Sequence, residues 1–168
     1  MTTAARSSVA VVLRRLLLLA LLALAGCDEA AGVRTGADGT AAVVERVVDG
    51  DTIVLSGLGK ARLIGVDTPE VYGRQECYGR EASEFAKRVL TRRRVRYRFG
   101  VERRDRYRRA LVYVWLEDGR FFNAMLVRQG FAVPLTVPPN VDYAERFVAL
   151  SADARAHERG LWAPGACS

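Results

Sequence analysis

The residues best suited to chemistry lie in one short segment, Arg62-Leu63-Ile64-Gly65-Val66-Asp67-Thr68-Pro69-Glu70. Its apolar start predicts a strand, which must end near Thr68 because Pro69 has a fixed φ and disfavours helix in the residue before it. A strand rises about 3.3 Å per residue, so Arg62 and Asp67 are spaced to lie on either side of a phosphate. For this segment alone, a strand that ends in a solvated turn is an equally good interpretation.

The spacing of Arg62 and Asp67 sets a geometric condition. The two residues are five apart, and a flat strand would point their side chains to opposite faces. Both reach one site only if the strand twists or bulges, or if Asp67 lies beyond its end. Gly65 stands between them and is suited to allow such a change of direction.

A second carboxylate, Asp51, follows the turn Asp49-Gly50 at the head of another predicted strand. Asp51 and Asp67 together would bind one hard divalent cation, and calcium tolerates the irregular geometry of loop ligands better than magnesium does. Zinc is disfavoured because His157 is the one histidine and no two cysteines are close in sequence. The presence of one histidine also disfavours hydrolysis by a Ser-His-Asp triad and nucleases that use histidine.

Two arginines, Arg62 and Arg109, are candidates for a clamp on a phosphate, because guanidinium groups match phosphate oxygens and stay charged. Glu70 would then orient or deprotonate an attacking water. Three acids in a basic groove repel phosphate unless a cation joins them, so a passive binding groove has no use for them. The set therefore predicts metal-assisted phosphodiester hydrolysis.

The charge of the chain, +7 in total, is concentrated in one block. Twelve basic residues stand between positions 87 and 109, and two acids accompany them. Such a block attracts polyanions such as nucleic acid or anionic lipid, although a solvated arginine-rich face is an equally good interpretation. The basic residues are Lys87, Arg88, Arg92, Arg93, Arg94, Arg96, Arg98, Arg103, Arg104, Arg106, Arg108 and Arg109.

The N-terminus has the pattern of an export signal. Three arginines precede a short apolar run, and residues 24–27, Leu-Ala-Gly-Cys, resemble a bacterial lipobox. We expect residues 1–26 to be a lipoprotein signal peptide and Cys27 to be lipidated, which anchors the protein to a bacterial membrane facing the periplasm or the cell exterior. An ordinary secreted protein with a chance cysteine is the alternative.

The remainder divides into a tether, one domain and a tail. Residues 27–40 are rich in Ala, Gly and Asp and predict a flexible tether. Residues 41–162 suit one domain with a modest core, and residues 163–168 form a C-terminal tail. After lipidation of Cys27 two cysteines remain, and export predicts a disulfide between Cys77 and Cys167.

The pattern of the domain predicts a mainly β fold with helices, of the α+β class. We expect five strands, at residues 41–48, 52–55, 61–66, 95–99 and 110–116, and three helices, at 80–90, 122–129 and from about 142 onward. Asp142 and Glu145 have the spacing of a capping box for the last helix, and a loop is predicted at 131–139. Five strands with a helix between the third and fourth is the order of a five-stranded OB-fold barrel.

Five ordered motifs resemble the thermonuclease family, the staphylococcal or micrococcal nucleases. They are Val48-Asp49-Gly50-Asp51-Thr52, the segment from Arg62 to Glu70, Tyr78-Gly79-Arg80-Glu81-Ala82-Ser83, Asp105-Arg106-Tyr107-Arg108-Arg109 and Leu126-Val127-Arg128-Gln129-Gly130. The resemblance covers about residues 43–162. It implies that the protein hydrolyses DNA and RNA in a reaction that depends on calcium (Ca2+) and leaves products with 3′-phosphates. It also implies that single strands are the preferred substrates and that the protein is a monomer.

The resemblance also implies a role for each matching residue. Asp51 and Asp67 match the calcium carboxylates, and Thr68 matches the residue that supplies a backbone carbonyl to the metal. Arg62, Glu70 and Arg109 match the catalytic residues. Arg106 and Tyr107 match positions that contact a substrate phosphate.

Two departures from the family pattern stand out. Arg108 replaces a glycine, and a side chain there would either alter the turn that aims Arg109 or add a phosphate contact. The loop after Gly130 carries residues 133–138, Val-Pro-Leu-Thr-Val-Pro, where the best-known member has tyrosines that flank the terminal base. The resemblance therefore does not extend to base stacking at this loop, nor to the base preference and affinity that depend on it.

Two other functions compete with hydrolysis. One is a non-catalytic OB module that binds nucleic acid on the cell envelope, which the joint presence of the acidic and basic site residues argues against. The other is a structural envelope lipoprotein whose basic face contacts lipid, which leaves the acidic residues without a role.

Overall fold

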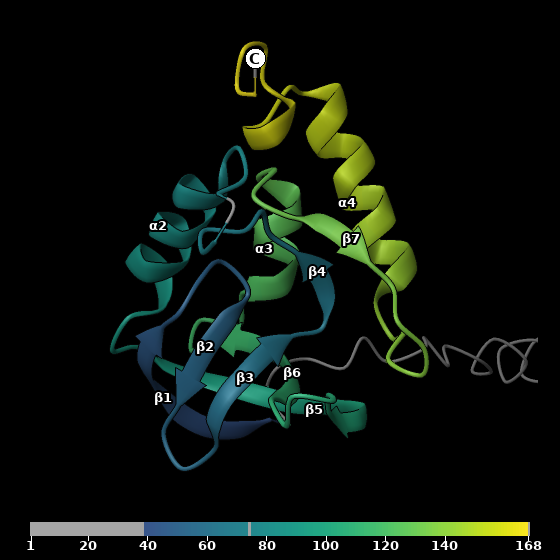
Figure 1. Cartoon of the computed structure of the whole chain (residues 1–168). Coiled ribbons are helices and arrows are strands. Elements are labelled where there is room, and N and C mark those ends of the chain that lie inside the picture. The colour runs from purple at the N-terminus through teal and green to yellow at the C-terminus, as the bar shows by residue number, and fades with distance from the viewer. Residues whose placement is uncertain (1–38, 74, 168) are drawn as a thin grey trace, which may run out of the picture. The chain divides into compact units, whose positions relative to one another are not determined.

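A computed structural model describes residues 39–73 and 75–167 of the chain (Figure 1). The predicted signal peptide, Cys27 and nearly all of the predicted tether lie outside these residues. Within the described part, no helix is long and apolar enough to cross a bilayer.

Five strands close into a barrel, which confirms the predicted α+β fold of the OB type. The order around the barrel is β1, β2, β3, β6, β5, and β1 pairs again with β5. The β3–β6 pair is parallel and the other pairs are antiparallel. The bounds are β1 Thr40–Val47, β2 Thr52–Leu55, β3 Gly59–Leu63, β5 Arg94–Arg104 and β6 Ala110–Leu116.

Three helices of the described region lie beyond one end of the barrel, toward the top of Figure 1. They are α2 (Gly79–Leu90), α3 (Phe122–Arg128) and α4 (Ala144–Ala156), and a short 3-10 helix, η2 (Gly160–Trp162), follows α4. The first two agree with the predicted ranges. The predicted capping box is wrong, because α4 begins after Tyr143 and has no side-chain cap.

The sequence predictions missed a small second sheet. The predicted third strand is divided at Ile64 into β3 and β4 (Gly65–Asp67), and the predicted loop after Gly130 contains β7 (Val133–Leu135). Strands β4 and β7 pair antiparallel, with Asp67 opposite Val133. The apolar run 61–66 thus serves two sheets, which its hydrophobicity alone does not reveal.

The division at Ile64 is stabilised by a buried asparagine. The Ile64 N–H donates to the Val112 carbonyl (2.9 Å), and the Ile64 carbonyl accepts from Asn123 Nδ2 (2.9 Å). Asn123 Oδ1 in turn accepts the Val114 N–H (3.0 Å), and its side chain is fully buried. Asn123 therefore satisfies two backbone groups that a continuous ladder would otherwise pair.

Gly65 makes the change of direction possible. Its φ is +79°, and a Cβ built on it would lie 2.4 Å from the ring of Phe147 on α4. Both the left-handed backbone and the close approach of the ring require a residue without a side chain.

The chain contains a disulfide between Cys77 and Cys167, with Cα atoms 5.6 Å apart. Cys77 lies in the loop between β4 and α2, and Cys167 follows η2. The bond therefore connects the loop after Glu70 to the C-terminal tail.

We expect Gly65→Ala to lower the free energy of unfolding by about 2–4 kcal/mol, because it adds overpacking against Phe147 to the strain of a left-handed residue. Gly119→Ala is the matched control, since Gly119 has a φ of +83° and a Cβ added to it would meet no atom within 4 Å. Urea unfolding measures both. Equal losses for the two variants would show that the Phe147 contact is unimportant.

Candidate active site

Arg62 joins the two predicted metal carboxylates. Its Nη1 forms an ion pair with Asp51 Oδ2, and its Nη2 donates to Asp67 Oδ1 at 2.7 Å. The Arg62 and Asp51 side chains are 14% and 8% exposed, so their pairing is shielded from water, whereas the Asp67 side chain is 49% exposed. Asp51 and Asp67 are thus close enough to contact one cationic group, as a shared metal site requires.

The Asp51 carboxylate is buried and held by Thr68. Asp51 Oδ2 accepts the Thr68 N–H (2.8 Å) and Oγ1–H (2.9 Å), and Oδ1 accepts from Thr52 Oγ1 (3.2 Å). Gly50 permits this approach, because a Cβ there would lie 2.7 Å from the Thr68 side chain. Burial raises the pKa of the Asp51 carboxyl, and Arg62 and the Thr68 hydrogen bonds offset only part of that rise.

The donor set fits a hard cation. Asp51, Asp67 and the Thr68 backbone present oxygen atoms only, which suits calcium better than zinc. A buried carboxylate whose pKa is raised gains stability from a nearby cation. Within the described part of the chain, no three His, Cys, Asp or Glu side chains are arranged to hold a metal ion by themselves, so backbone carbonyls and waters must complete the coordination of a metal here.

Arg109 is aimed by the turn between β5 and β6. Asp105 Oδ2 accepts from Arg109 Nε at 2.6 Å, and Asp105 Oδ1 accepts the backbone N–H groups of Tyr107 and Arg109, both at 2.9 Å. Partial burial raises the pKa of Asp105, but the hydrogen bonds from Arg109 outweigh it and hold that pKa below its usual value. Asp105 leaves the two Nη groups of Arg109 available to a ligand.

Arg108 occupies the position of the family glycine without disrupting this turn. Its φ is +64°, in the left-handed region, which explains why glycine is usual there. Its N–H donates to the Asp105 carbonyl (2.9 Å), and its own carbonyl accepts from Arg104 Nη1 (2.9 Å). The Arg108 side chain is exposed, and the bonds from Asp105 to Arg109 are intact.

Arg106 and Tyr107 lie beside Arg109. Arg106 Nη2 donates to the Tyr107 hydroxyl at 2.7 Å, and the guanidinium carbons of Arg106 and Arg109 lie 4.8 Å and 5.4 Å from the centre of the Tyr107 ring. The Tyr107 side chain is 64% exposed. The ring therefore keeps two cationic side chains together at the surface.

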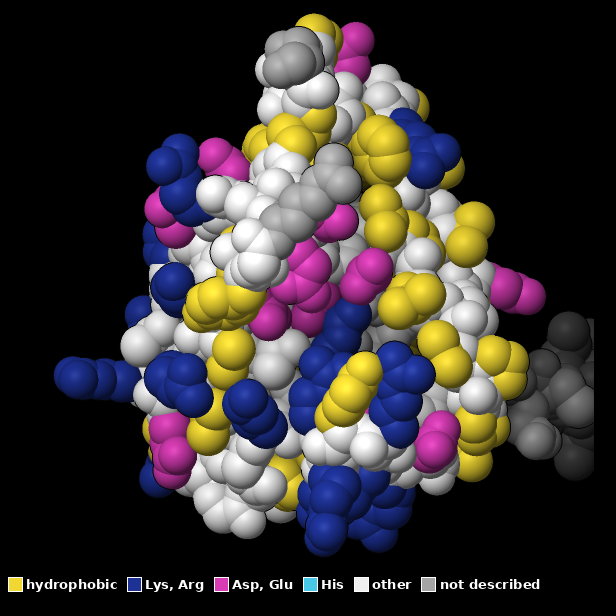
Figure 2. All heavy atoms as spheres, viewed as in Figure 1, with side chains coloured by type: hydrophobic (Ala, Val, Ile, Leu, Met, Phe, Trp, Pro, Cys, Tyr) yellow, Lys and Arg dark blue, Asp and Glu magenta, His cyan; other side chains and the backbone are white. Residues whose placement is uncertain are grey.

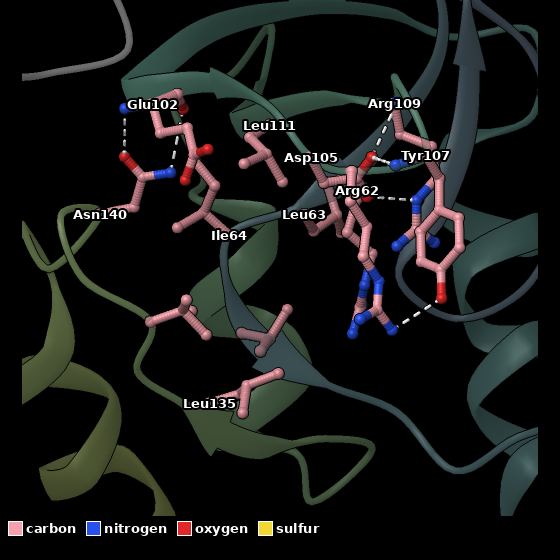
Figure 3. Close-up of a pocket in the computed structure, with 14 residues that line it drawn as sticks. Arg62, Leu63, Ile64, Glu102, Asp105, Tyr107, Arg109, Leu111, Leu135 and Asn140 are labelled. Carbon is pink, nitrogen blue, oxygen red and sulfur yellow. Dashed lines mark hydrogen bonds and ion pairs between the residues drawn. The ribbon is translucent and has the colours of Figure 1, made fainter.

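One pocket of about 520 Å³ is lined by Arg62, Arg106, Tyr107 and Arg109, but not by Asp51, Asp67 or Thr68 (Figure 3). Its arginine-rich end is formed by Arg62, Asp105, Arg106, Tyr107 and Arg109, and its other part is lined by aliphatic residues together with Glu102 and Asn140. Figure 2 shows acidic side chains gathered directly beside basic ones in the middle of the face it presents. The aliphatic residues are Leu63, Ile64, Val66, Leu111, Leu135 and Val137.

Glu70 is placed differently from the other predicted catalytic residues. Its carboxylate is exposed and makes no hydrogen bond or ion pair with another residue in 39–73 or 75–167, and Glu70 does not line the pocket. Its backbone is nevertheless held, since its N–H donates to Glu76 Oε2 at 3.0 Å. Glu70 thus lies three residues beyond Asp67, with its carboxylate open to solvent.

The structure divides the basic block of residues 87–109. Arg106 and Arg109 belong to the site, whereas Arg88, Arg93 and Arg94 line a separate pocket of about 390 Å³ together with Arg120. The block therefore contributes to two separate pockets.

Three positioning residues were missed by the sequence predictions. Asp105 was quoted only as part of a motif, although it orients Arg109. Asn123 is described above, and Asn140 binds both backbone groups of Glu102 (2.9 and 3.0 Å) at the edge of the pocket. Asp105 had a usable signal in its position before three arginines, but an isolated asparagine has none.

A closed five-stranded barrel, with arginines lining one pocket and two carboxylates paired with one of these arginines, defines an OB-fold protein whose site suits phosphate and a cation. The chain belongs to the staphylococcal nuclease family, since the model of staphylococcal nuclease homologues matches residues 60–164. This confirms the resemblance drawn from the motifs.

Sequence identity to individual nucleases supports the assignment to this family. The chain is 38% identical to the thermonuclease of Staphylococcus hyicus over 143 residues, which span 82% of this chain and 83% of that protein. It is 39% identical to the thermonuclease of Staphylococcus intermedius over 134 residues, 76% of this chain and 79% of the relative. It is 35% identical to endonuclease YhcR of Bacillus subtilis over 135 residues, 71% of this chain but 11% of that longer protein.

We expect Asp105→Asn to lower the free energy of unfolding by about 1–3 kcal/mol at neutral pH, as for the loss of hydrogen bonds to a charged group. A carboxyl group whose pKa is lower in the folded state than in the unfolded state stabilises the folded protein. This contribution is complete at a pH above the pKa of the unfolded state, about 3.9, and is lost as the pH falls through the pKa of the folded state. The difference between variant and parent should therefore shrink in strong acid. Urea unfolding across pH measures it.

Asp118→Asn is the matched control for this experiment. Asp118 accepts from the backbone and Nε of Arg120 (3.0 and 2.8 Å) in a similar turn, but that pair is exposed. A smaller effect is expected there. Equal effects for the two variants would contradict the importance of the shielded Asp105–Arg109 pair.

Proposed function

We propose that this chain, a nuclease by family, is a calcium-dependent enzyme that hydrolyses DNA and RNA and leaves 3′-phosphates. The observation that carries the proposal is the contact of Asp51 and Asp67 with the one guanidinium of Arg62, which lines the same pocket as Arg109. Cation ligands and phosphate ligands thus adjoin each other.

The proposed metal ligands are Asp51, Asp67 and the Thr68 carbonyl. Calcium bound to them would act as a Lewis acid on a phosphoryl oxygen. The burial of Asp51 supports this assignment, because a raised carboxyl pKa reports a site that favours added positive charge.

Arg62 and Arg109 bind the scissile phosphate in this proposal. Both line the same pocket, and Asp105 presents Arg109 with its terminal nitrogens toward that space. Guanidinium groups on two sides stabilise the charge that concentrates on phosphorus in the transition state. Arg106 and Tyr107 contact a neighbouring phosphate.

Glu70 is the proposed general base. It takes a proton from the attacking water through a carboxylate that no other described side chain engages. Its exposure keeps it accessible to water and leaves its charge available when substrate covers the pocket.

Single strands are the preferred substrate in this proposal, because their bases are free to enter the aliphatic part of the pocket. Leu135, at the end of β7, and Val137, which follows it, are 42% and 56% exposed and lie in the segment where the best-known member has tyrosines. Aliphatic contact lacks the stacking energy of aromatic rings, so we expect weak base preference.

Export, the lipid anchor at Cys27 and a monomeric state are also part of the proposal. The apolar run and lipobox-like residues of the sequence support the first two. A Cys77–Cys167 disulfide is compatible with an oxidising compartment outside the cytoplasm.

The function is tested by digestion of single-stranded DNA with calcium and with EDTA. We expect cleavage when calcium is present and no cleavage when EDTA is present. Mass spectrometry should detect 3′-phosphate ends on the products. Glu70→Gln should lower kcat about 10²–10⁴-fold, as for loss of a general base, and spare binding. Glu81→Gln, which removes an equal charge on α2, is the control.

Tight binding without cleavage under any divalent cation would favour the alternative, a nucleic-acid-binding OB module. Steep loss of binding at higher salt would show that arginines contact phosphates in either case.

Arg109→Ala should raise the barrier by about 3–4 kcal/mol, as for loss of a donor to the transition state. Arg108→Gly is the neighbouring control and should retain activity, because the bonds of Asp105 to Arg109 do not involve the Arg108 side chain. Steady-state kinetics on an oligonucleotide measure both. A large loss in Arg108→Gly would mean that Arg108 itself contacts substrate.

A further inference from the structure

We infer that Glu76 is a positioning residue for Glu70 and that the Cys77–Cys167 disulfide keeps Glu76 in place. The inference rests on the proposed role of Glu70 as general base. It concerns the loop between β4 and α2, residues 68–78, whose start carries Glu70 and whose end carries Glu76 and Cys77.

Glu70 and Glu76 hold each other by reciprocal hydrogen bonds. The Glu70 N–H donates to Glu76 Oε2 at 3.0 Å, and the Glu76 N–H donates to the Glu70 carbonyl at 2.9 Å. Glu76 thus occupies both backbone hydrogen-bonding groups of the residue that bears the proposed base. The bond to Oε2 is charge-assisted and is the stronger kind.

The start of α2 packs against the same backbone. A Cβ built on Gly79 would lie 2.5 Å from the Glu70 carbonyl and 2.9 Å from that of Pro69. The Gly79 N–H also donates to the Glu76 carbonyl at 3.2 Å. The backbone of Glu70 is therefore enclosed between Glu76 and the first residue of the helix.

The disulfide fixes the position of Glu76 from outside the loop. Cys77, its neighbour, is bonded to Cys167 in the tail. That tail is attached to the domain through η2, because the Leu161 N–H donates to the Gly130 carbonyl at 2.8 Å and no side chain fits between Gly130 and Gly160. The loop end is thus tied covalently to a segment that packs on the residues directly after α3.

Backbone restraint matters here because the Glu70 side chain has no partner of its own among the described residues. Its direction depends on the backbone that bears it. A displacement of about 1 Å in a reacting group is enough to cost about 10²-fold in rate. Glu76 and the disulfide, which line neither the pocket nor the proposed metal site, supply that restraint.

The decisive experiment compares Glu76→Ala with Glu76→Gln in the purified, oxidised chain. The amide oxygen of glutamine still accepts the Glu70 N–H, whereas alanine removes the acceptor. We expect kcat to fall roughly 10- to 100-fold in Glu76→Ala with KM unchanged, and to change less than about 3-fold in Glu76→Gln. Amide exchange at Glu70, followed by NMR, should accelerate in Glu76→Ala alone.

A double-mutant cycle separates this inference from the proposed function. With Glu70→Gln as background, Glu76→Ala should cause no further loss of kcat, because the base is already absent. An independent loss in that background would overturn the positioning role. If Glu70→Gln itself retains full activity, the proposed base is wrong, whatever Glu76 does.

The double variant Cys77→Ser/Cys167→Ser tests the proposed role of the disulfide, at a temperature where circular dichroism shows that the fold is intact. We expect faster amide exchange at Glu70 and Glu76 and a lower kcat with unchanged KM. Unchanged exchange and kcat would overturn the role of the disulfide. If this variant does not fold, mild reduction of the exposed disulfide in the folded protein gives the same readouts.

Discussion

Arg62 and Asp67 stand five residues apart, and a continuous strand would hold their side chains on opposite faces. They meet at 2.7 Å because the chain leaves one sheet at Ile64 and enters another at Gly65. Asn123 satisfies the backbone of Ile64, and Phe147 packs where a side chain of Gly65 would be. The contacts of α3 with Ile64 and of α4 with Gly65 therefore decide whether the carboxylates and the arginine share a site.

Charge balance explains the rest of the site. Asp51 is buried, and a buried carboxylate requires positive charge or donated hydrogen bonds nearby. Arg62 and Thr68 supply both. Asp105 orients Arg109 in a similar way, because it accepts a hydrogen bond from Nε and leaves the terminal nitrogens of the guanidinium open. Acids and arginines alternate, so each holds its neighbour in a direction useful for phosphate and metal.

Glu70, the third proposed catalytic residue, is held in place differently from Arg62 and Arg109. Arg62 and Arg109 are placed by barrel strands and a tight turn, whereas Glu70 lies on a surface segment without a ladder of its own. Loops of this kind are mobile unless tied down. Reciprocal bonds to Glu76, the close packing of Gly79 and a disulfide to the tail provide the attachment that strands provide elsewhere.

Much of the fold followed from the sequence. Alternating and apolar runs predicted the five barrel strands, helical spacing predicted α2 and α3, and ordered motifs predicted the family, because these signals are local and repeat with the period of each element. The second sheet was missed because β4 and β7 have only three residues each and pair across a helix, two barrel strands and a second helix of intervening chain. No local pattern reports such a pairing.

The sequence by itself determined which residue types are present for chemistry: acids and arginines at strand ends, one histidine, and a pair of cysteines, one in the domain and one in the tail. Tertiary structure decided which of them meet. Arg62 reaches Asp67 because Gly65 adopts a left-handed φ beneath Phe147, and Glu70 is held by Glu76 because the loop returns to the start of α2. Such contacts depend on the packing of distant elements, which spacing along a chain does not encode.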